Sequence, residues 1–132
     1  MGRLKEARRE ARELVSGEKI ALARKLRRTV KRLPGNTRVE ELSFWITHPK
    51  ADKVPKRVRR LTREIDSEER DFLGRNLKRI TRPGRNPHLY TLEKARGFIS
   101  ERAEPVSRIK KEYGVSDKTA AFIVLGLAVK NR

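Results

Sequence analysis

The 132-residue chain contains no cysteine and no glutamine, and it has only one methionine and one tryptophan. Without cysteine, disulfide bonds and thiolate metal sites are excluded. Long apolar runs are also missing, since the longest one, Ala120–Val129, is too short to cross a bilayer. The N-terminus lacks the apolar region that a secretory signal contains. These absences predict a protein that makes no membrane contact and has no oxidative crosslinks.

Acidic residues are scarce relative to basic ones, 17 against 35, which gives a formal net charge of +18. An excess of this size is beyond what solubility requires and indicates an anionic partner. Nucleic acid is favoured over a membrane surface, because the apolar faces of the N-terminal segments are rich in alanine and hold no aromatic anchor. Arginine outnumbers lysine 22 to 13, and 39% of the residues are charged, a composition that suggests a hot environment.

Residues 21–33, ALARKLRRTVKRL, carry six basic residues and no acidic one. On a helical wheel the basic side chains fill an arc of about 160°, opposite an apolar arc of about 100°. Like charges four residues apart, such as Arg24 and Arg28, destabilise an isolated helix by about 0.2–0.5 kcal/mol per pair. The alternative, an ordinary solvated face, usually mixes charges of both signs. The repeated repulsion therefore indicates that an external anion compensates these charges.

Two further segments continue this basic pattern. In residues 3–15, the basic, acidic and apolar side chains form three separate stripes, so the basic stripe can face a polyanion. In residues 55–64, a second basic cluster follows Pro55, which is well placed to begin a helix. The candidate nucleic-acid-binding residues of the three segments are Lys5, Arg8, Arg9, Arg12, Arg24, Lys25, Arg27, Arg28, Lys31, Arg32, Lys56, Arg57, Arg59, Arg60 and Arg63.

All regular segments show helical periodicity and no strand pattern is present, so the predicted fold class is all-α. The expected helices cover residues 3–15, 18–33, 37–46, 55–64, 67–81, 92–103, 105–113 and 117–130. Thr37-Arg-Val-Glu40 and Asp66-Ser-Glu-Glu69 predict capping boxes, and Gly114 predicts a left-handed C-cap. The other predicted N-caps are Ser16, Thr91 and Ser116.

Charge and apolar content divide the chain unevenly. Residues 1–63 carry +13 (20 basic, 7 acidic), residues 64–132 carry +5, and the large apolar side chains concentrate after Phe72. This distribution predicts a basic helical arm, residues 1–50, attached to a compact helical bundle, residues 51–132. A single helix with a narrow apolar stripe is marginal in water. The arm is therefore expected to dock on the bundle, on neighbouring subunits or on nucleic acid, and its residues 1–33 are expected to be largely disordered in the isolated protein.

The C-terminal segment 105–130 resembles a helix-turn-helix, with a glycine-containing turn followed by a capped helix. In a DNA reader the second helix exposes polar side chains to base edges. Here that helix is apolar nearly all round, with Lys118 and Thr119 as its obvious early polar residues. An all-round apolar helix is typical of a buried position, which we favour over a recognition helix.

No pattern of residues indicates catalysis, a metal or a cofactor. Five acidic residues crowd 64–71, but acids at a helix N-terminus complement the helix dipole, and this interpretation is favoured over a nuclease metal site. His48 and His88 lie in expected loops without companion ligands. Phe44 and Trp45 are interpreted as packing residues rather than base-stacking ones, because no other aromatic residues interleave with the basic ones. We therefore expect no enzymatic activity and no cofactor.

A basic N-terminal helical arm before a small cysteine-free helical bundle resembles the DNA-wrapping major coat (capsid) proteins of filamentous and rod-shaped archaeal viruses. The resemblance covers the whole chain and lies in architecture, length and charge. It implies a coat subunit of a helical virion, assembled with itself or a related coat protein, whose arms enclose linear double-stranded DNA in A-form without base readout. It also implies that the basic residues of 3–33 and 50–63 line the DNA channel. A charge of +18 could neutralise about nine base pairs per subunit.

Two other functions share some of these features. A ribosomal or other structural-RNA-binding protein would have the same size, charge and arm. A helix-turn-helix regulator or a chromatin protein is the third alternative. Filament formation with duplex DNA, dependence on ribosomal RNA, and a defined operator footprint would distinguish the three functions.

Overall fold

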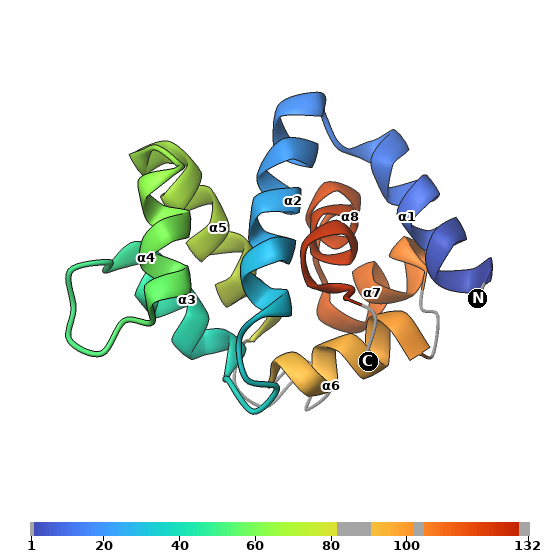
Figure 1. Cartoon of the computed structure of the whole chain (residues 1–132). Coiled ribbons are helices and arrows are strands. Elements are labelled where there is room, and N and C mark those ends of the chain that lie inside the picture. Colours follow the sequence, from blue (N-terminus) through green and yellow to red (C-terminus); the bar gives the residue numbers. More distant parts are fainter. Residues whose placement is uncertain (1, 82–90, 102–104, 130–132) are drawn as a thin grey trace.

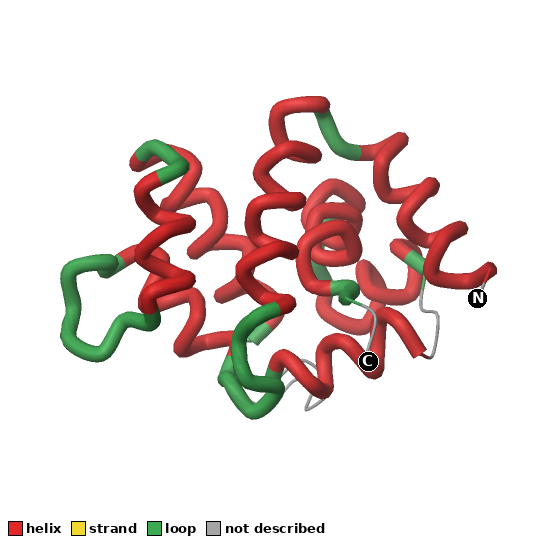
Figure 2. Tube along the Cα trace, in the orientation of Figure 1, coloured by secondary structure: helices red, strands yellow, loops and turns green. Residues whose placement is uncertain are grey.

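The computed structural model of the chain describes residues 2–81, 91–101 and 105–129, and it confirms the all-α fold class (Figure 1). Over these ranges the regular structure is helical, without a strand; one isolated bridge joins Arg38 and Thr91 (Figure 2). The helices are α1 (Gly2–Leu14), α2 (Gly17–Lys31), α3 (Val39–Thr47), α4 (Lys56–Arg63), α5 (Ser67–Ile80), α6 (Leu92–Arg96), the π-helical turn η2 (Gly97–Glu101), α7 (Val106–Tyr113) and α8 (Asp117–Leu127). Residues 82–87, which follow the expected helix 67–81, and His88 lie outside the described residues.

Helix α8 is the centre around which α1, α2 and α7 pack (Figure 1). Every residue of this helix from Thr119 onward is buried, as its apolar sequence requires. Gly126 marks the closest approach of α2 to α8, because a Cβ there would lie 2.8 Å from Leu26 Cδ2. From Thr119 onward α8 has no exposed face to place in a DNA groove, which argues against its interpretation as a recognition helix; Asp117 and Lys118, its first two residues, are exposed.

Helices α3, α4 and α5 form the second half of the molecule, on the other side of α2 (Figure 1). Helix α3 packs against α5 at Gly74, where a Cβ would lie 2.3 Å from Thr47 Cγ2. The Ser43 hydroxyl donates to the Gly74 carbonyl oxygen at 3.1 Å across the same contact. Helix α4 contacts both α2 and α3, and it buries Val58 and Leu61. These contacts fix α4 beside α2.

The expected separation of an arm, residues 1–50, from a bundle, residues 51–132, does not appear in the packing. Leu4, Ala7 and Ala11 of α1 belong to the same apolar core as α8. In α2, Leu22 and Leu26 are buried to 1% exposure or less. The two N-terminal helices reach this core because the uncharged surface of α8 covers their narrow apolar stripes. The basic residues of the first 33 positions are therefore presented by a folded body.

The structure confirms most of the helix caps that the sequence predicts. The Asp66 carboxylate accepts from the Glu69 backbone N–H at 2.8 Å, and the Glu69 carboxylate accepts from the Asp66 N–H at 3.0 Å, which confirms that capping box. Side-chain caps at Thr91 and Ser116 and the left-handed Gly114 (φ 60°) are also confirmed. Ser16 is the N-cap of α2 but makes no side-chain capping bond.

The capping box at Thr37 is wrong, because α3 begins one residue later, with Arg38 as its N-cap. The Thr37 carbonyl oxygen instead accepts from the Leu92 N–H at 2.9 Å, and the Gly35 carbonyl accepts from the Glu93 N–H at 2.8 Å. The segment before α3 is thereby tied to the start of α6. A tertiary backbone pairing has replaced the local side-chain cap that the sequence predicts.

Candidate nucleic-acid interface

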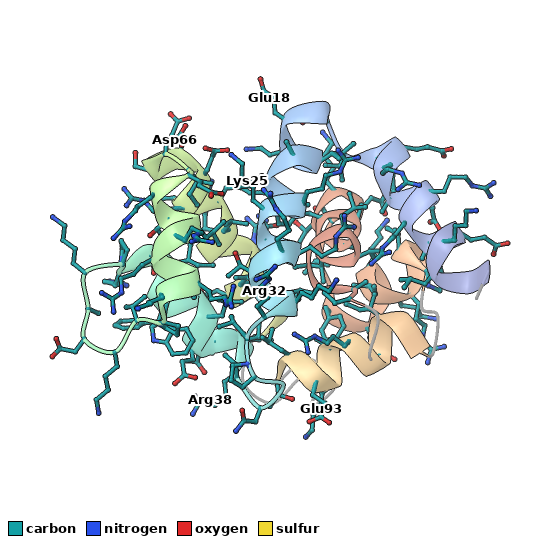
Figure 3. All side chains as sticks on the ribbon, in the orientation of Figure 1. Glu18, Lys25, Arg32, Arg38, Asp66 and Glu93 are labelled. Atoms are coloured by element: carbon teal, nitrogen blue, oxygen red, sulfur yellow. The ribbon has the colours of Figure 1, made fainter. Side chains whose placement is uncertain are left out.

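The two basic clusters predicted from the sequence meet in a groove between α2 and α4. The groove has a volume of about 800 Å³. Its nine basic lining residues are Lys25, Arg28, Lys31, Arg32, Lys56, Arg57, Arg59, Arg60 and Arg63. A single acidic residue, Glu64, is among the residues that line it. We call this feature the α2–α4 groove; Lys25 and Arg32 mark its α2 side in Figure 3.

The groove faces solvent because α2 and α4 each bury the apolar face that lies opposite their basic face. Helix α2 turns Leu26 and Val30 into the core, and α4 does the same with Val58 and Leu61. The basic side chains between these positions must then point outward, because helical residues three and four apart share a face. The groove is thus a direct result of the amphipathic pattern of two separate segments.

Two of the nine basic side chains also bind the backbone of the groove itself. Lys25 Nζ donates to the Glu64 carbonyl oxygen at 3.1 Å, which joins α2 to the end of α4. Arg59 Nε donates to the Val54 carbonyl oxygen at 3.0 Å, in the turn that precedes α4. The preceding residue, Lys53, has a φ of 63°, a left-handed conformation that L-residues seldom adopt. These bonds order the groove, and most of its guanidinium groups remain directed to solvent.

Four other candidate residues form a second group between α1 and α2, which we call the α1–α2 arginine cluster: Arg8, Arg12, Arg24 and Arg27. Burial lowers the pKa of Arg8 below its ordinary value, and the charges of Arg27 and Arg12 lower that pKa further. Burial likewise lowers the pKa of Arg27, with smaller contributions from Arg24 and Arg12. Both pKa values therefore fall first because of burial and second because of repulsion between neighbouring guanidinium groups, which remain protonated at neutral pH.

Arg8 has a structural role that the sequence analysis missed. Its guanidinium donates to the Ala128 carbonyl oxygen at the C-terminal end of α8. Arg96 does the same for α2, donating to the carbonyl oxygen of Val30, the second-last residue of that helix. Cations at such positions satisfy open carbonyl groups and complement the helix dipole. No sequence signal separates Arg8 from the other residues of its stripe, because the carbonyl it caps lies at the far end of the chain.

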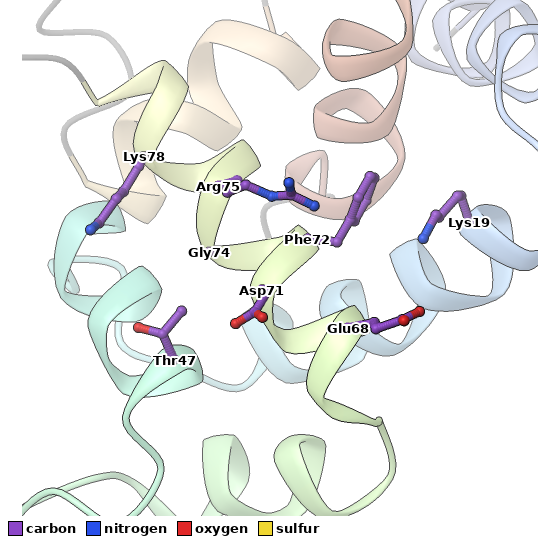
Figure 4. Close-up of a pocket in the computed structure, with 8 residues that line it drawn as sticks. All are labelled: Lys19, Thr47, Glu68, Asp71, Phe72, Gly74, Arg75 and Lys78. Carbon is purple, nitrogen blue, oxygen red and sulfur yellow. The ribbon is translucent and has the colours of Figure 1, made fainter.

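The remaining candidate residues, Lys5 and Arg9, are exposed on α1 and belong neither to the α2–α4 groove nor to the α1–α2 arginine cluster. A separate hollow is lined by side chains of both charges together with uncharged residues. Its lining residues are Lys19, Thr47, Glu68, Asp71, Phe72, Gly74, Arg75 and Lys78 (Figure 4). In it the Lys19 ammonium lies 4.1 Å from the centre of the Phe72 ring. Since carboxylates and cations nearly balance there, this hollow does not attract a polyanion as the α2–α4 groove does.

The other residues considered from the sequence have local roles. Asp66 and Glu69 cap α5, in agreement with the preference for a helix-terminus role of the acidic segment 64–71. The exposed Phe44 ring stacks on His48, with centroids 4.5 Å apart, while Trp45 packs against the core. Among the described residues, no group of histidine and acidic side chains could hold a metal ion. In the same ranges no helix has the length and apolar character that a membrane span needs.

Comparisons with known proteins identify no relative of this chain. No protein-family model matches it. Searches of curated proteins and of solved structures also returned no match.

Proposed function

We propose that this chain is a structural nucleic-acid-binding protein that coats linear double-stranded DNA through phosphate contacts, as the major capsid protein of a helical virion does. The observation that supports the proposal is the α2–α4 groove, where nine cations face one carboxylate. Such a groove carries a high positive potential, and that potential draws in a polyanion. Its charge is compensated when phosphates enter.

The composition of the groove supports binding without sequence preference. Its lining is almost entirely lysine and arginine, with no asparagine or glutamine to pair with adenine. Contacts between such side chains and phosphates carry no sequence information and weaken steeply with salt. A protein that must cover a whole genome needs this kind of binding. The net charge of +18 is sufficient for about nine base pairs per subunit.

The groove can be tested with a fourfold variant, Arg28→Gln, Arg32→Gln, Arg57→Gln and Arg60→Gln. All four side chains are exposed, and glutamine keeps the helix propensity. We expect the variant to keep its helical circular dichroism and to lose duplex affinity. The slope of log affinity against log salt should fall by about 3.6, which is 0.9 per lost phosphate contact.

A matched control removes four exposed cations that do not line the groove: Arg75→Gln, Lys78→Gln, Arg79→Gln and Lys111→Gln. Both variants have the same net charge. The control should bind duplex DNA with nearly the wild-type slope, because only charges that touch phosphate release counterions. Equal losses in both variants would show that net charge alone decides binding, and the groove assignment would then be wrong.

The coat function is tested by electron microscopy of the protein mixed with linear duplex DNA. We expect regular helical filaments of constant diameter. Preferential binding to structured RNA with no filament on DNA would instead support the ribosomal or structural-RNA alternative. A footprint confined to one DNA sequence would support a regulator.

A further inference from the structure

The α1–α2 arginine cluster carries more positive charge than its structural role requires. Arg8 caps the C-terminal end of α8, where a helix presents about half a negative charge. The cluster holds four guanidinium groups, so about 3.5 positive charges remain uncompensated. Among the described residues, none of the ion pairs includes a member of the cluster.

Burial makes this excess charge costly. Arg8 and Arg27 are half-buried, and the Nε of Arg8 has no hydrogen-bond partner among the described residues. Charges in such surroundings are less screened by water than charges on an open surface. A group of repelling, partly desolvated arginines fits an anion with several acceptor oxygens. Phosphate has this chemistry, and guanidinium binds it through paired hydrogen bonds.

The cluster and the α2–α4 groove lie along the two edges of the basic arc of α2. At 100° per residue, Arg27 and Lys25 stand at these edges, about 160° apart around the helix axis, and the other basic residues of α2 lie between them. Lys25 is directed to α4, where it reaches the Glu64 carbonyl, whereas Arg27 is directed to Arg8 and Arg12 of α1. Helix α2 therefore lies between two rows of cations, the α1–α2 arginine cluster and the α2–α4 groove, which we call the two tracks.

We propose that the two tracks hold the two strands of one duplex, with α2 lying along the groove between them. This inference rests on the proposed function. A helix with its side chains is about 10–12 Å across, which matches the major groove of B-DNA at about 12 Å. A single strand has one backbone and can occupy only one track. The pair of tracks thus selects double-stranded over single-stranded nucleic acid.

The test compares two double variants with equal charge loss. Arg12→Gln with Arg24→Gln removes the exposed half of the cluster and leaves the half-buried Arg8 and Arg27 in place. Arg57→Gln with Arg60→Gln removes two exposed cations of the groove. A third variant, Arg75→Gln with Lys78→Gln, is the matched control on exposed positions of α5, outside both tracks. Affinities are measured for a short duplex and for its separated strand over a series of salt concentrations.

The cluster variant should bind the duplex about tenfold or more weakly, with the log–log salt slope reduced by about 1.8, and bind the single strand as the wild type does. The groove variant should weaken both ligands, and the control should change neither. A cluster variant with wild-type duplex affinity would overturn the two-track proposal, as would equal losses for duplex and single strand. The proposed function would survive those two results. A wild-type protein that binds neither ligand would overturn both.

Discussion

The guanidinium of Arg8 donates to the backbone carbonyl of Ala128, so a residue of the first helix closes the end of the last one. The two residues are 120 positions apart in the chain. This contact makes Arg8 different from every other cation of its stripe, because its removal acts on folding as well as on charge.

Replacing Arg8 by Gln should therefore lower the free energy of unfolding by about 1–3 kcal/mol, since a charged hydrogen bond to the end of α8 is lost. Chemical denaturation measures this loss. Arg9→Gln, on the exposed face of the same helix, is the control and should stay within about 0.5 kcal/mol of the wild type. If both variants are equally stable, Arg8 does not cap α8.

The two close helix contacts give a second prediction. Gly126→Ala places a methyl group 2.8 Å from the buried Leu26 side chain, and Gly74→Ala places one 2.3 Å from Thr47. Overpacking of this kind costs about 1–3 kcal/mol, which exceeds the gain of about 1 kcal/mol in helix propensity. Thermal unfolding should rank Gly74→Ala below Gly126→Ala, and both below the wild type.

Gly17→Ala is the matched control for these glycines. It lies at the first position of α2, and a Cβ there meets nothing within 4 Å. This substitution should leave the melting temperature unchanged or raise it, because alanine improves helix propensity there and causes no steric clash. A drop as large as that of Gly126→Ala would show that glycine conformation, not close helix packing, sets the cost.

Tyr113 gives a prediction for alkaline pH. Its hydroxyl is buried without a hydrogen-bond partner among the described residues, and burial, followed by the charge of Glu112, raises its pKa well above the ordinary value of 10.0. Because the pKa of Tyr113 is higher in the folded chain than in the unfolded chain, its neutral hydroxyl contributes fully to the free energy of unfolding below pH 10. This contribution is lost at about 1.4 kcal/mol per pH unit as pH rises further, because the unfolded chain then ionises more readily.

Tyr113→Phe should remove this dependence while keeping the edge-on contact with Phe98, whose ring centre lies 5.9 Å away. Denaturation at a series of pH values checks this. Below pH 10 the variant should be about 1 kcal/mol more stable than the wild type, because an unpartnered hydroxyl is gone. Above pH 10 the difference should widen. A difference that is constant across the whole series would contradict the assignment.

Hydrogen exchange on the free protein distinguishes a docked α2 from a disordered arm. Leu22, Leu26 and Val30 are each at most 1% exposed, so the amides of this helix should exchange as slowly as those of α8. Exchange within seconds across residues 21–31, together with protection of α8, would restore the disordered-arm expectation and contradict the packing described above.

The sequence predicted those features that depend on neighbouring residues. The capping box at Asp66, the left-handed Gly114 and the burial of α8 all follow from short patterns, and the structure has each of them. The basic residues of α2 and α4 were also identified, because each lies opposite its own apolar stripe.

The remaining features depend on contacts between distant segments, which no local pattern encodes. The joining of α2 and α4 into one groove follows from how both helices pack in the folded chain. Arg8 and Arg12 look identical in sequence, and only the position of Ala128 separates a capping residue from an exposed one. The thin apolar stripe of the first two helices predicts an arm with little support of its own, and no pattern within residues 1–33 encodes the apolar surface of α8 on which they pack.

The central position of α8 has a consequence for synthesis. The ribosome makes α1 and α2 well before α8, so both helices emerge with no surface to cover their apolar stripes. Contacts between residues so far apart slow folding relative to other helical proteins. Until α8 emerges, the basic helices α1 and α2 lie beside ribosomal RNA without a cover for their apolar stripes. A message that stops before Asp117 would yield a product with nearly all of the cations but without the helix that holds α1 and α2 in place.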